Sequence, residues 1–541
     1  MRIKELMNAV KKRDDAAALG SGQQKFLNFC CSCVKVILAI VLGILTVSSM
    51  LVTCSVDLQE WIHYSPDKIY LHILFAGMIA FLLIVCRHVR NSLRGSWLER
   101  VFRDFTQRMD FCKVVVIAHF VLGIFWVVST QVIPQVDQLF CAEIAERQMF
   151  SDYDFADYKV GGYAYNYPYQ SGLILTLSIV FRLFGGQNFI AFQICNVFAM
   201  LLFDIALLKI TEYIESPAAK KVAAVLIFIF WPLVFYTVFI YGNLMGLAFA
   251  VAAVCFEYRY FRKRRLRDIV ISSVFIGLAV MMKSNYLIFL VAMLIFLVLD
   301  FIASRRKRTI LFAVLAVGCY LIGTKGPITY MTIRGNLDIE GGVPMIAFVS
   351  MGLRESELAP GWWSGYYNES LYTENDYNQD LASAQAIEDI RARLSDFASD
   401  PGYTADFFYK KMISQWCEPT FEGIWINHYE KGVTISGIVD NILNRNLKSV
   451  VEDFLNLYQT FIYWPALLFV ILNRKNNNIF LWLPGTAVIG GFLFHMVWEA
   501  KGQYTMPYFV MLIPYALITA VQVSKWGDDR ICPMLRGKRD V

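Results

Sequence analysis

Long apolar runs, most of them near the length that crosses a bilayer, recur along almost the whole chain. A membrane-spanning helix needs about 20 mostly apolar residues, so runs of this kind leave few folds open. The chain has 541 residues, of which 57% are hydrophobic and only 17% are charged. We therefore predict an all-α polytopic membrane protein with about 12 transmembrane helices. The runs cover residues 34–53, 69–86, 114–133, 188–208, 222–240, 244–258, 269–282, 285–303, 309–325, 453–472, 479–497 and 504–522.

Clusters of basic residues occupy every second connection between these runs, which is the pattern of cytoplasmic loops. The net charge of +6 is small and divided among short clusters, which argues against a nucleic-acid-binding surface. We expect a plasma-membrane protein with both termini in the cytoplasm. The clusters are Arg87 to Lys113, Lys209 with Lys220 and Lys221, Arg262 to Arg267, Arg305 to Arg308, Arg474 with Lys475, and Arg536 to Arg539.

Two long connections then fall outside the cytoplasm. The first covers 134–187, and its short apolar run 173–184 is expected to be an interfacial helix, because counting it as a span would place Arg262 to Arg267 outside. The second covers 326–450 and is long enough for a small folded unit, with a surface helix at 382–397. The predicted regions are 1–110 with two extra spans, a core at 111–325, the loop 326–450, and 451–541 with the last spans and a short tail.

Asp137 follows the run 114–133 at what should be the outer rim of the membrane. A carboxylate costs roughly 2.5–3.5 kcal/mol at the bilayer centre and much less at its edge. At this rim it can take a proton from a molecule that arrives in the aqueous phase, or it can serve only as an N-cap or first-turn acid of a helix. Glu143 lies further along the same helix, and Tyr165 and Tyr167 follow it. These tyrosines suit either an aromatic belt or a sugar-binding surface.

Two lysines, Lys283 and Lys501, stand at outer ends of apolar runs, where the positive-inside rule does not favour them. Converging cations at an outer rim suit an anionic lipid headgroup such as a phosphate. The alternative is that each lysine snorkels to the interface.

The histidines are isolated and the cysteines show no metal-ligand arrangement with them, so we expect neither a metal site nor a cofactor. Cys141 and Cys417 both fall outside in this topology, which leaves a disulfide between them open.

Several short motifs recur in order: Asp137, Tyr167-Pro168 before a helix ending Leu183-Phe184-Gly185, Met282-Lys283, and Ala500-Lys501-Gly502. This series resembles the GT-C glycosyltransferases related to protein O-mannosyltransferases and the lipid A aminoarabinose transferase, often grouped as glycosyltransferase family 39-like. The resemblance spans roughly residues 112–520. It differs at Gln138, where relatives usually carry a second acid, and at Tyr241-Gly242-Asn243, where another acid often begins the next outer turn.

The resemblance implies a GT-C-like core with an outer cleft, and transfer of a sugar from a polyprenyl-phosphate donor with inversion. The acceptor is expected to be an extracytoplasmic glycan, lipid or protein. Asp137 would be the general base, and Lys283 and Lys501 would lie near the donor phosphate. Tyr165, Tyr167, Glu143 and Asn243 are further candidates for substrate binding. The competing hypotheses are a lipid-linked sugar flippase or transporter, and an envelope polysaccharide polymerase or ligase.

Overall fold

The computed structural model describes residues 21–92, 97, 110–150, 154–214, 217–337, 339, 341–428 and 436–536. Within these residues, 10 helices are long and apolar enough to cross a membrane, or up to 11 if a bent pair counts as one span. The expected all-helical, multi-pass membrane fold is therefore confirmed. The spans lie in α2 (Ser21–Leu51), α3 (Ile69–Ser92), α5 (Phe111–Thr130), α9 (Phe189–Ile214), α12 (Asn243–Lys263), α14 (Leu287–Ser304), α15 (Lys307–Gly335), α22 (Asn446–Leu472), α23 (Leu483–Val497), and α24 (Gly502–Phe509) with α25 (Ile513–Arg536).

Two of the predicted runs do not form straight spans of full length. The run 222–240 is divided into α10 (Pro217–Phe228) and a second piece, α11 (Pro232–Phe235) with a short 3-10 turn, and the two pieces are bent by 53°. Pro232 begins the second piece, and a proline has no N–H to continue the helical bonding across the break. The run 269–282 becomes α13 (Leu266–Met282), which at 17 residues is short for a bilayer.

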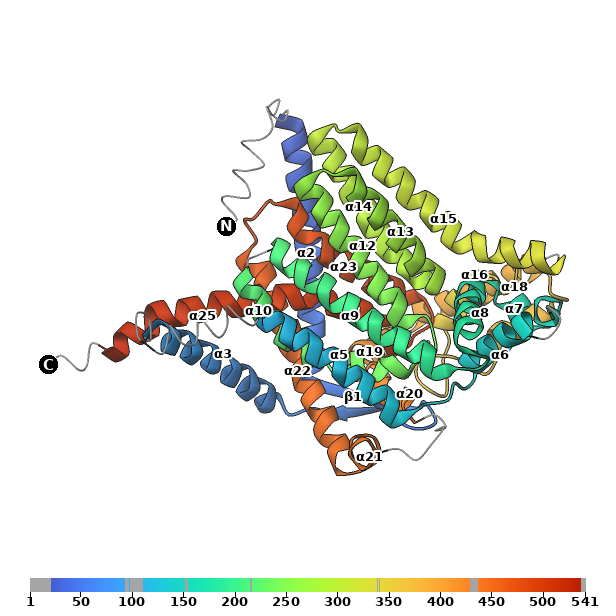
Figure 1. Cartoon of the computed structure of the whole chain (residues 1–541), viewed down its shortest axis with the longest axis horizontal. Helices are drawn as coiled ribbons and strands as arrows, with labels where there is room; N and C mark the ends of the chain where they lie inside the picture. The colour runs from blue at the N-terminus through green and yellow to red at the C-terminus, as the bar shows by residue number, and fades with distance from the viewer. Residues whose placement is uncertain are drawn as a thin grey trace.

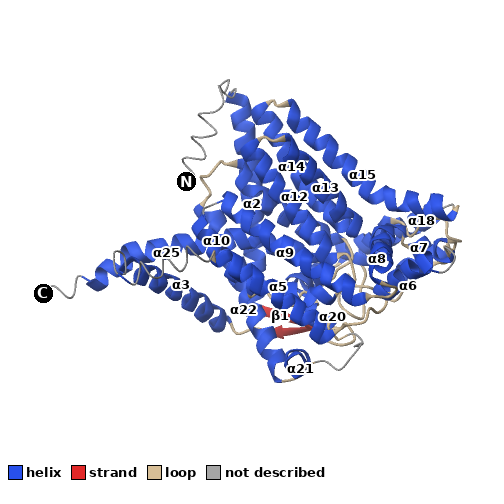
Figure 2. Cartoon of the chain, viewed as in Figure 1, coloured by secondary structure: helices blue, strands red, loops and turns tan. Residues whose placement is uncertain are grey.

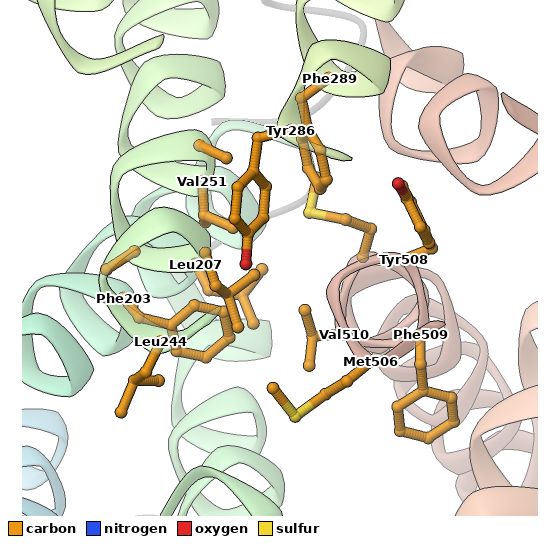
Figure 3. Close-up of a cluster of buried hydrophobic side chains, with 14 of the residues drawn as sticks. Phe203, Leu207, Leu244, Val251, Tyr286, Phe289, Met506, Tyr508, Phe509 and Val510 are labelled. Atoms are coloured by element: carbon orange, nitrogen blue, oxygen red, sulfur yellow. The ribbon is translucent and has the colours of Figure 1, made fainter. Parts of the chain in front are cut away.

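The spans are arranged in a bundle from which two helices project. In Figure 1, α9, α12, α13 and α14 occupy the middle of the molecule, while α3 and α25 extend together to the left. At the N-terminal ends of α12 and α14, large apolar side chains from several helices meet (Figure 3). They include Phe203 and Leu207 of α9, Leu244 of α12, Phe289 of α14, and Met506 of α24, all of them buried. This cluster joins α9, α12, α14 and α24 in one close-packed core.

The two ends of the bundle differ in charge. α12 runs for 21 residues, about 30 Å at 1.5 Å per residue, from Asn243 to Lys263. At its far end Arg264 forms two hydrogen bonds with Asp300 of α14, at 2.6 and 2.7 Å, and Arg308 lies beside it. Asn243 marks the opposite end, which we call the site end. Most of the predicted cluster 87–113 and the residues after Arg536 lie outside the described residues.

Two buried polar side chains of the spans form a pair. His119 of α5, expected from the sequence to be isolated, places Nδ1 2.8 Å from Oδ2 of Asp204 in α9. Both side chains are almost fully buried, so this contact joins the two helices and compensates a carboxylate that would be costly alone.

The two long connections fold against each other at the site end. The first contains α6 (Asp137–Phe150), α7 (Tyr163–Asn166) and α8 (Ser171–Phe184). The second contains α16 (Met345–Gly352), α17 (Tyr367–Glu374), α18 (Gln379–Ser399), α19 (Pro401–Trp416), α20 (Gly423–Ile426) and α21 (Gly437–Asn444). The expected surface helix at 382–397 is part of α18. Trp416 and Phe421 belong to the main core, so this loop is continuous with the bundle.

A β-hairpin between the first two spans was not predicted from the sequence. It is the only sheet among the described residues, with β1 (Val52–Val56) paired antiparallel to β2 (Ile62–Pro66), and it stands out among the helices in Figure 2. Its outer edges bind the second loop: the Cys54 N–H donates to the Cys417 carbonyl at 2.9 Å, and the Ile62 N–H donates to the Leu358 carbonyl at 3.3 Å. The two extra N-terminal spans are thereby tied to the site end.

Candidate functional site

Asp137 begins α6 directly after a strained backbone position. Val136 has a φ of +51°, which is unusual for a β-branched residue and typical of positions where the surrounding structure enforces a conformation. The Asp137 side chain is exposed to solvent, yet protein surrounds it closely enough that desolvation raises its pKa. The charges of Lys501 and Lys283 and a hydrogen bond from Tyr163 oppose this rise. Asp137 therefore remains accessible to solvent while Lys501, Lys283 and Tyr163 act on its carboxyl group.

Gln138, at the place where the resemblance leads us to expect a second acid, is buried and has a structural contact. Its Oε1 accepts the N–H of Ile240 at 3.0 Å. Gln193 of α9 supports the same junction by donating to the carbonyls of Val132 (2.7 Å) and Val238 (3.2 Å). The start of α6 is thus fastened to the segment that leads into α12.

The start of α12 meets the end of α13 at very close range. A Cβ on Gly242 would lie 1.9 Å from the carbonyl oxygen of Met282, so only glycine fits there. The next residue, Asn243, accepts a hydrogen bond from Lys283 Nζ at Oδ1, at 2.8 Å. Tyr286 donates its hydroxyl hydrogen to the Asn243 carbonyl at 2.5 Å. This close approach therefore sets the position of Lys283.

Lys283 is enclosed by neutral groups. Its Nζ lies 4.9 Å from the ring centroid of Tyr241 and 4.6 Å from that of Tyr504. Besides Asn243, its only other hydrogen-bond acceptor among the described residues is Gln503 Oε1, at 3.5 Å. Burial without a paired carboxylate lowers the pKa of Lys283 to about 7. Ring faces and amide oxygens stabilise an ammonium ion but leave its charge available to an anion.

Lys501, in contrast, is neutralised by a carboxylate. It forms an ion pair with Glu60, from the turn of the β-hairpin, and both side chains are largely enclosed, at 15% and 16% exposure. Its Nζ also lies 5.7 Å from the ring centroid of Trp425. Burial alone would lower the pKa of Lys501, but Glu60 and then Glu422 raise it above its ordinary value. This lysine is charged under all ordinary conditions.

Gln503 links the surroundings of the two lysines. Its Nε2 donates to Glu422 Oε2 at 3.0 Å, its backbone N–H donates to Glu422 Oε1 at 3.2 Å, and its Oε1 accepts from Asn243 at 2.9 Å. Burial raises the pKa of Glu422 to about 8, against the opposing charge of Lys501. Glu422 therefore joins Gln503, and through it Asn243, to the surroundings of Lys501.

A pocket opens beside Lys283. Phe348 and Trp498 stack in its wall, with ring centroids 5.4 Å apart. Glu499 also faces it; burial raises the pKa of its carboxyl group to about 7. Aromatic walls around a few polar groups are typical of sugar- and ligand-binding pockets. The lining residues are Tyr169, Gln170, Tyr241, Lys283, Ser284, Asn285, Met345, Phe348, Trp498, Glu499 and Tyr504.

The remaining candidates from the sequence lie in different surroundings. Tyr167 donates its hydroxyl hydrogen to Glu369 at 2.9 Å and so joins the two long connections. Tyr165 is buried in the core of the second loop, stacked on Tyr372 with centroids 6.4 Å apart. Glu143 is 3.7 Å from Arg147 on the next turn of α6. None of the three lines the pocket.

Sequence reasoning missed several residues of this site. Tyr163, Glu60 and Glu422 lie in loops with many similar residues, and nothing local distinguishes them. Gln503 and Tyr504 had a usable signal, because they immediately follow the Lys501-Gly502 pair at the start of a span.

Neither a metal cluster nor the suggested disulfide is found. Among the residues that the structure describes, no group of three or more His, Cys, Asp or Glu side chains is arranged to hold a metal ion. Cys141 and Cys417 are both buried free thiols, so the bridge left open by the sequence is not formed. Cys417 lies beside Cys54, through the backbone hydrogen bond described above.

Replacing Gly242 by alanine is expected to lower the thermal unfolding midpoint and to weaken any ligand binding at Lys283. The new methyl group would overlap the Met282 carbonyl, and such overpacking typically costs about 1–3 kcal/mol. Gly318→Ala is the matched control, because nothing lies within 4 Å of its Cβ. Unfolding of the purified protein in nanodiscs compares the two. Equal midpoints for both variants would contradict the close approach.

Comparison with known proteins gives one partial family match. Residues 173–324 match the family model described as dolichyl-phosphate-mannose-protein mannosyltransferase; this stretch contains Asn243 and Lys283 but neither Asp137 nor Lys501. No curated protein matches the chain. Among solved structures, the apo oligosaccharyltransferase of Archaeoglobus fulgidus aligns with 79% of the chain at 14% identity and a TM-score of 0.41. The chain covers 52% of that structure, about half its length. The resemblance to protein O-mannosyltransferases is thereby confirmed for residues 173–324.

Proposed function

We propose that the chain is a membrane glycosyltransferase with a GT-C-like core. It transfers a sugar from a polyprenyl-phosphate donor to an extracytoplasmic glycan, lipid or protein, with inversion at the anomeric carbon. Asp137 is the general base that takes the proton of the acceptor hydroxyl, and Lys283 binds the donor phosphate. The family match over residues 173–324 supports the reaction class.

The observation that carries the proposal is the charge state around Lys283. Lys283 lies partly buried beside a pocket, held by neutral oxygens and ring faces, with Asp137 close enough for the two charges to interact. A phosphate entering the pocket gains a charge-assisted hydrogen bond without displacing a competing carboxylate. Lys501 is already paired with Glu60, which makes Lys283 the better candidate for direct contact.

The chemistry is an inverting substitution. The acceptor oxygen attacks the anomeric carbon as Asp137 removes its proton, and the bond from that carbon to the phosphate oxygen breaks. A positioned general base contributes typically 10²–10⁴-fold to such a step. The leaving phosphate carries the developing negative charge, which the Lys283 ammonium stabilises. The lipid chain stays in the bilayer throughout, which agrees with a site at the end of the spans.

We further propose that the site end faces away from the cytoplasm. The support is the charge of the opposite end, where Arg264 and Arg308 meet, since basic clusters favour the cytoplasmic side. Cysteine substituted at position 137 should react with a membrane-impermeant maleimide added outside intact cells. Labelling only from the cell interior would overturn both the orientation and the acceptor compartment.

Mass analysis of envelope glycans and lipid-linked sugars in a deletion strain tests the function. Loss of one decoration, with its lipid-linked sugar accumulating, is expected, and it would identify sugar and acceptor together. Accumulation of undelivered lipid-linked sugar on the cytoplasmic leaflet alone would instead indicate a flippase. Loss of polymer length with intact monomeric decoration would indicate a polymerase.

Binding of decaprenyl phosphate is expected to weaken as pH rises above about 7. Lys283 binds phosphate in its charged form. This form predominates below the Lys283 pKa of about 7 and is lost above it. The phosphate probe is already dianionic above pH 7, so its own titration does not compensate. Affinity in nanodiscs measured from pH 6 to 9 should fall, and Lys283→Gln should remove the dependence. A flat profile in the wild type would contradict this role.

A further inference from the structure

The β-hairpin between the first two spans contributes a side chain to the site. Backbone hydrogen bonds to Cys417 and Leu358 hold the hairpin on both edges. Its turn is closed by Asp57, whose Oδ1 accepts the N–H groups of Gln59 and Trp61, each at 2.9 Å. The hairpin is therefore a firmly held element, and its tip has a defined place.

Glu60 is the residue that this tip presents. Its φ of +69° lies in the left-handed region, and its N–H donates to the Asp57 carbonyl at 3.2 Å. The carboxylate reaches Lys501, which follows it by 441 positions in the chain. The residues next to Glu60 in the sequence do not predict its contact with Lys501, which forms only in the tertiary fold.

The ion pair between Glu60 and Lys501 gives the two lysines of the site different surroundings. Lys501 has a carboxylate at contact distance, whereas Lys283 has none among the described residues. A phosphate approaching Lys501 has to compete with Glu60, because both anions need the same N–H donors. A phosphate approaching Lys283 displaces no carboxylate, because the acceptors within hydrogen-bond distance of its Nζ are the amide oxygens of Asn243 and Gln503.

We propose that Glu60 is a positioning residue that withholds Lys501 from the donor phosphate, so that the phosphate binds at Lys283. This inference rests on the proposed function and assigns to the two extra N-terminal spans the task of delivering that carboxylate. The ligand is a phosphate attached to a lipid, and the expected source is a polyprenyl chain.

If Glu60 withholds Lys501, removing the Glu60 charge should increase the affinity for decaprenyl phosphate. Glu60→Gln should bind decaprenyl phosphate about 10-fold more tightly than wild type, because Lys501 then offers a second charge-assisted bond. The double variant Glu60→Gln/Lys501→Gln should return to within about threefold of wild type. A merely structural role for Glu60 would weaken binding, and Lys501→Gln would not reverse that.

The experiment uses the full-length protein in nanodiscs with decaprenyl phosphate, phosphatidic acid and inorganic phosphate as separate probes. Glu388→Gln, which removes the same charge from an exposed position on α18, is the matched control and should bind like wild type. Tightening seen equally with phosphatidic acid would indicate a general lipid-phosphate site and would overturn the polyprenyl assignment. If Glu60→Gln does not fold, Glu60→Asp, with its carboxylate withdrawn from Lys501, must bind more tightly than wild type.

Two failures can be told apart. If Lys283→Gln binds decaprenyl phosphate as wild type does, the proposed function fails whatever Glu60 does. If Lys283→Gln weakens binding as expected, but a folded Glu60 variant binds no more tightly than wild type, only the inference about Glu60 is overturned.

Discussion

Replacing Asp137 by asparagine is expected to lower the rate of sugar transfer by about 10²–10⁴-fold, the usual contribution of a positioned general base. Asparagine keeps the size of the side chain and can still accept a hydrogen bond from Tyr163, but it cannot take a proton. Donor binding should change little, because Lys283 is enclosed by other residues. The measurement is turnover of a radiolabelled lipid-linked sugar, with donor affinity determined in parallel.

The loss of activity at acidic pH provides a second test of Asp137. Only the ionised carboxylate is a base, and burial raises the Asp137 pKa above the ordinary value of 3.8. Activity should therefore be lost as pH falls through a midpoint higher than 3.8, and the residual activity of Asp137→Asn should lack this transition.

Glu146→Gln is the control for Asp137, since it removes one carboxylate from the same helix at a position that accepts a hydrogen bond from Gln187 instead of facing the site. It should retain near wild-type turnover. Wild-type turnover in Asp137→Asn would eliminate the general-base assignment, and the residue would then be only the first acid of α6.

The spans could be predicted from the sequence because length and apolar composition alone decide whether a helix can cross a bilayer. Each predicted run lies mostly in helix, and the two that do not form full-length straight spans are the run broken before Pro232 and the short α13. The hairpin could not be predicted in the same way. Each strand has only five residues, and the turn at 57–61 contains no glycine, proline or asparagine to mark it.

For the site, the sequence exposed those residues whose position is unusual for their type. Charged side chains at the ends of apolar runs that the charge pattern predicts to be outer, such as Lys283 and Lys501, are noticeable because the positive-inside rule disfavours them there. Glu60 and Glu422 stand in loops where acids are common, and their roles depend on packing between distant segments. Tyr165 and Tyr167 are two positions apart and look alike in the sequence. They enter different surroundings because Tyr165 lies within the short α7 and Tyr167 is its C-cap.

Replacing Lys283 by glutamine is expected to weaken binding of decaprenyl phosphate by about 10- to 100-fold. A hydrogen bond to a charged group contributes about 1.5–3 kcal/mol, and each 1.4 kcal/mol is a factor of ten in affinity. Glutamine can still donate a hydrogen bond to Asn243, so the fold should persist while the charge is lost. Lys410→Gln, at a half-exposed residue paired with Asp406 on α19, is the matched control and should leave affinity unchanged.

Lys283→Arg separates charge from shape at this position. It retains the positive charge, but the ammonium of Lys283 lies between the rings of Tyr241 and Tyr504, 4.9 and 4.6 Å from their centroids. The larger, planar guanidinium group does not fit that space without moving a ring. Arginine should therefore recover only part of the affinity lost in Lys283→Gln. Full recovery would mean that charge alone suffices, and unchanged affinity in the glutamine variant would mean that Lys283 merely anchors the chain at the membrane surface.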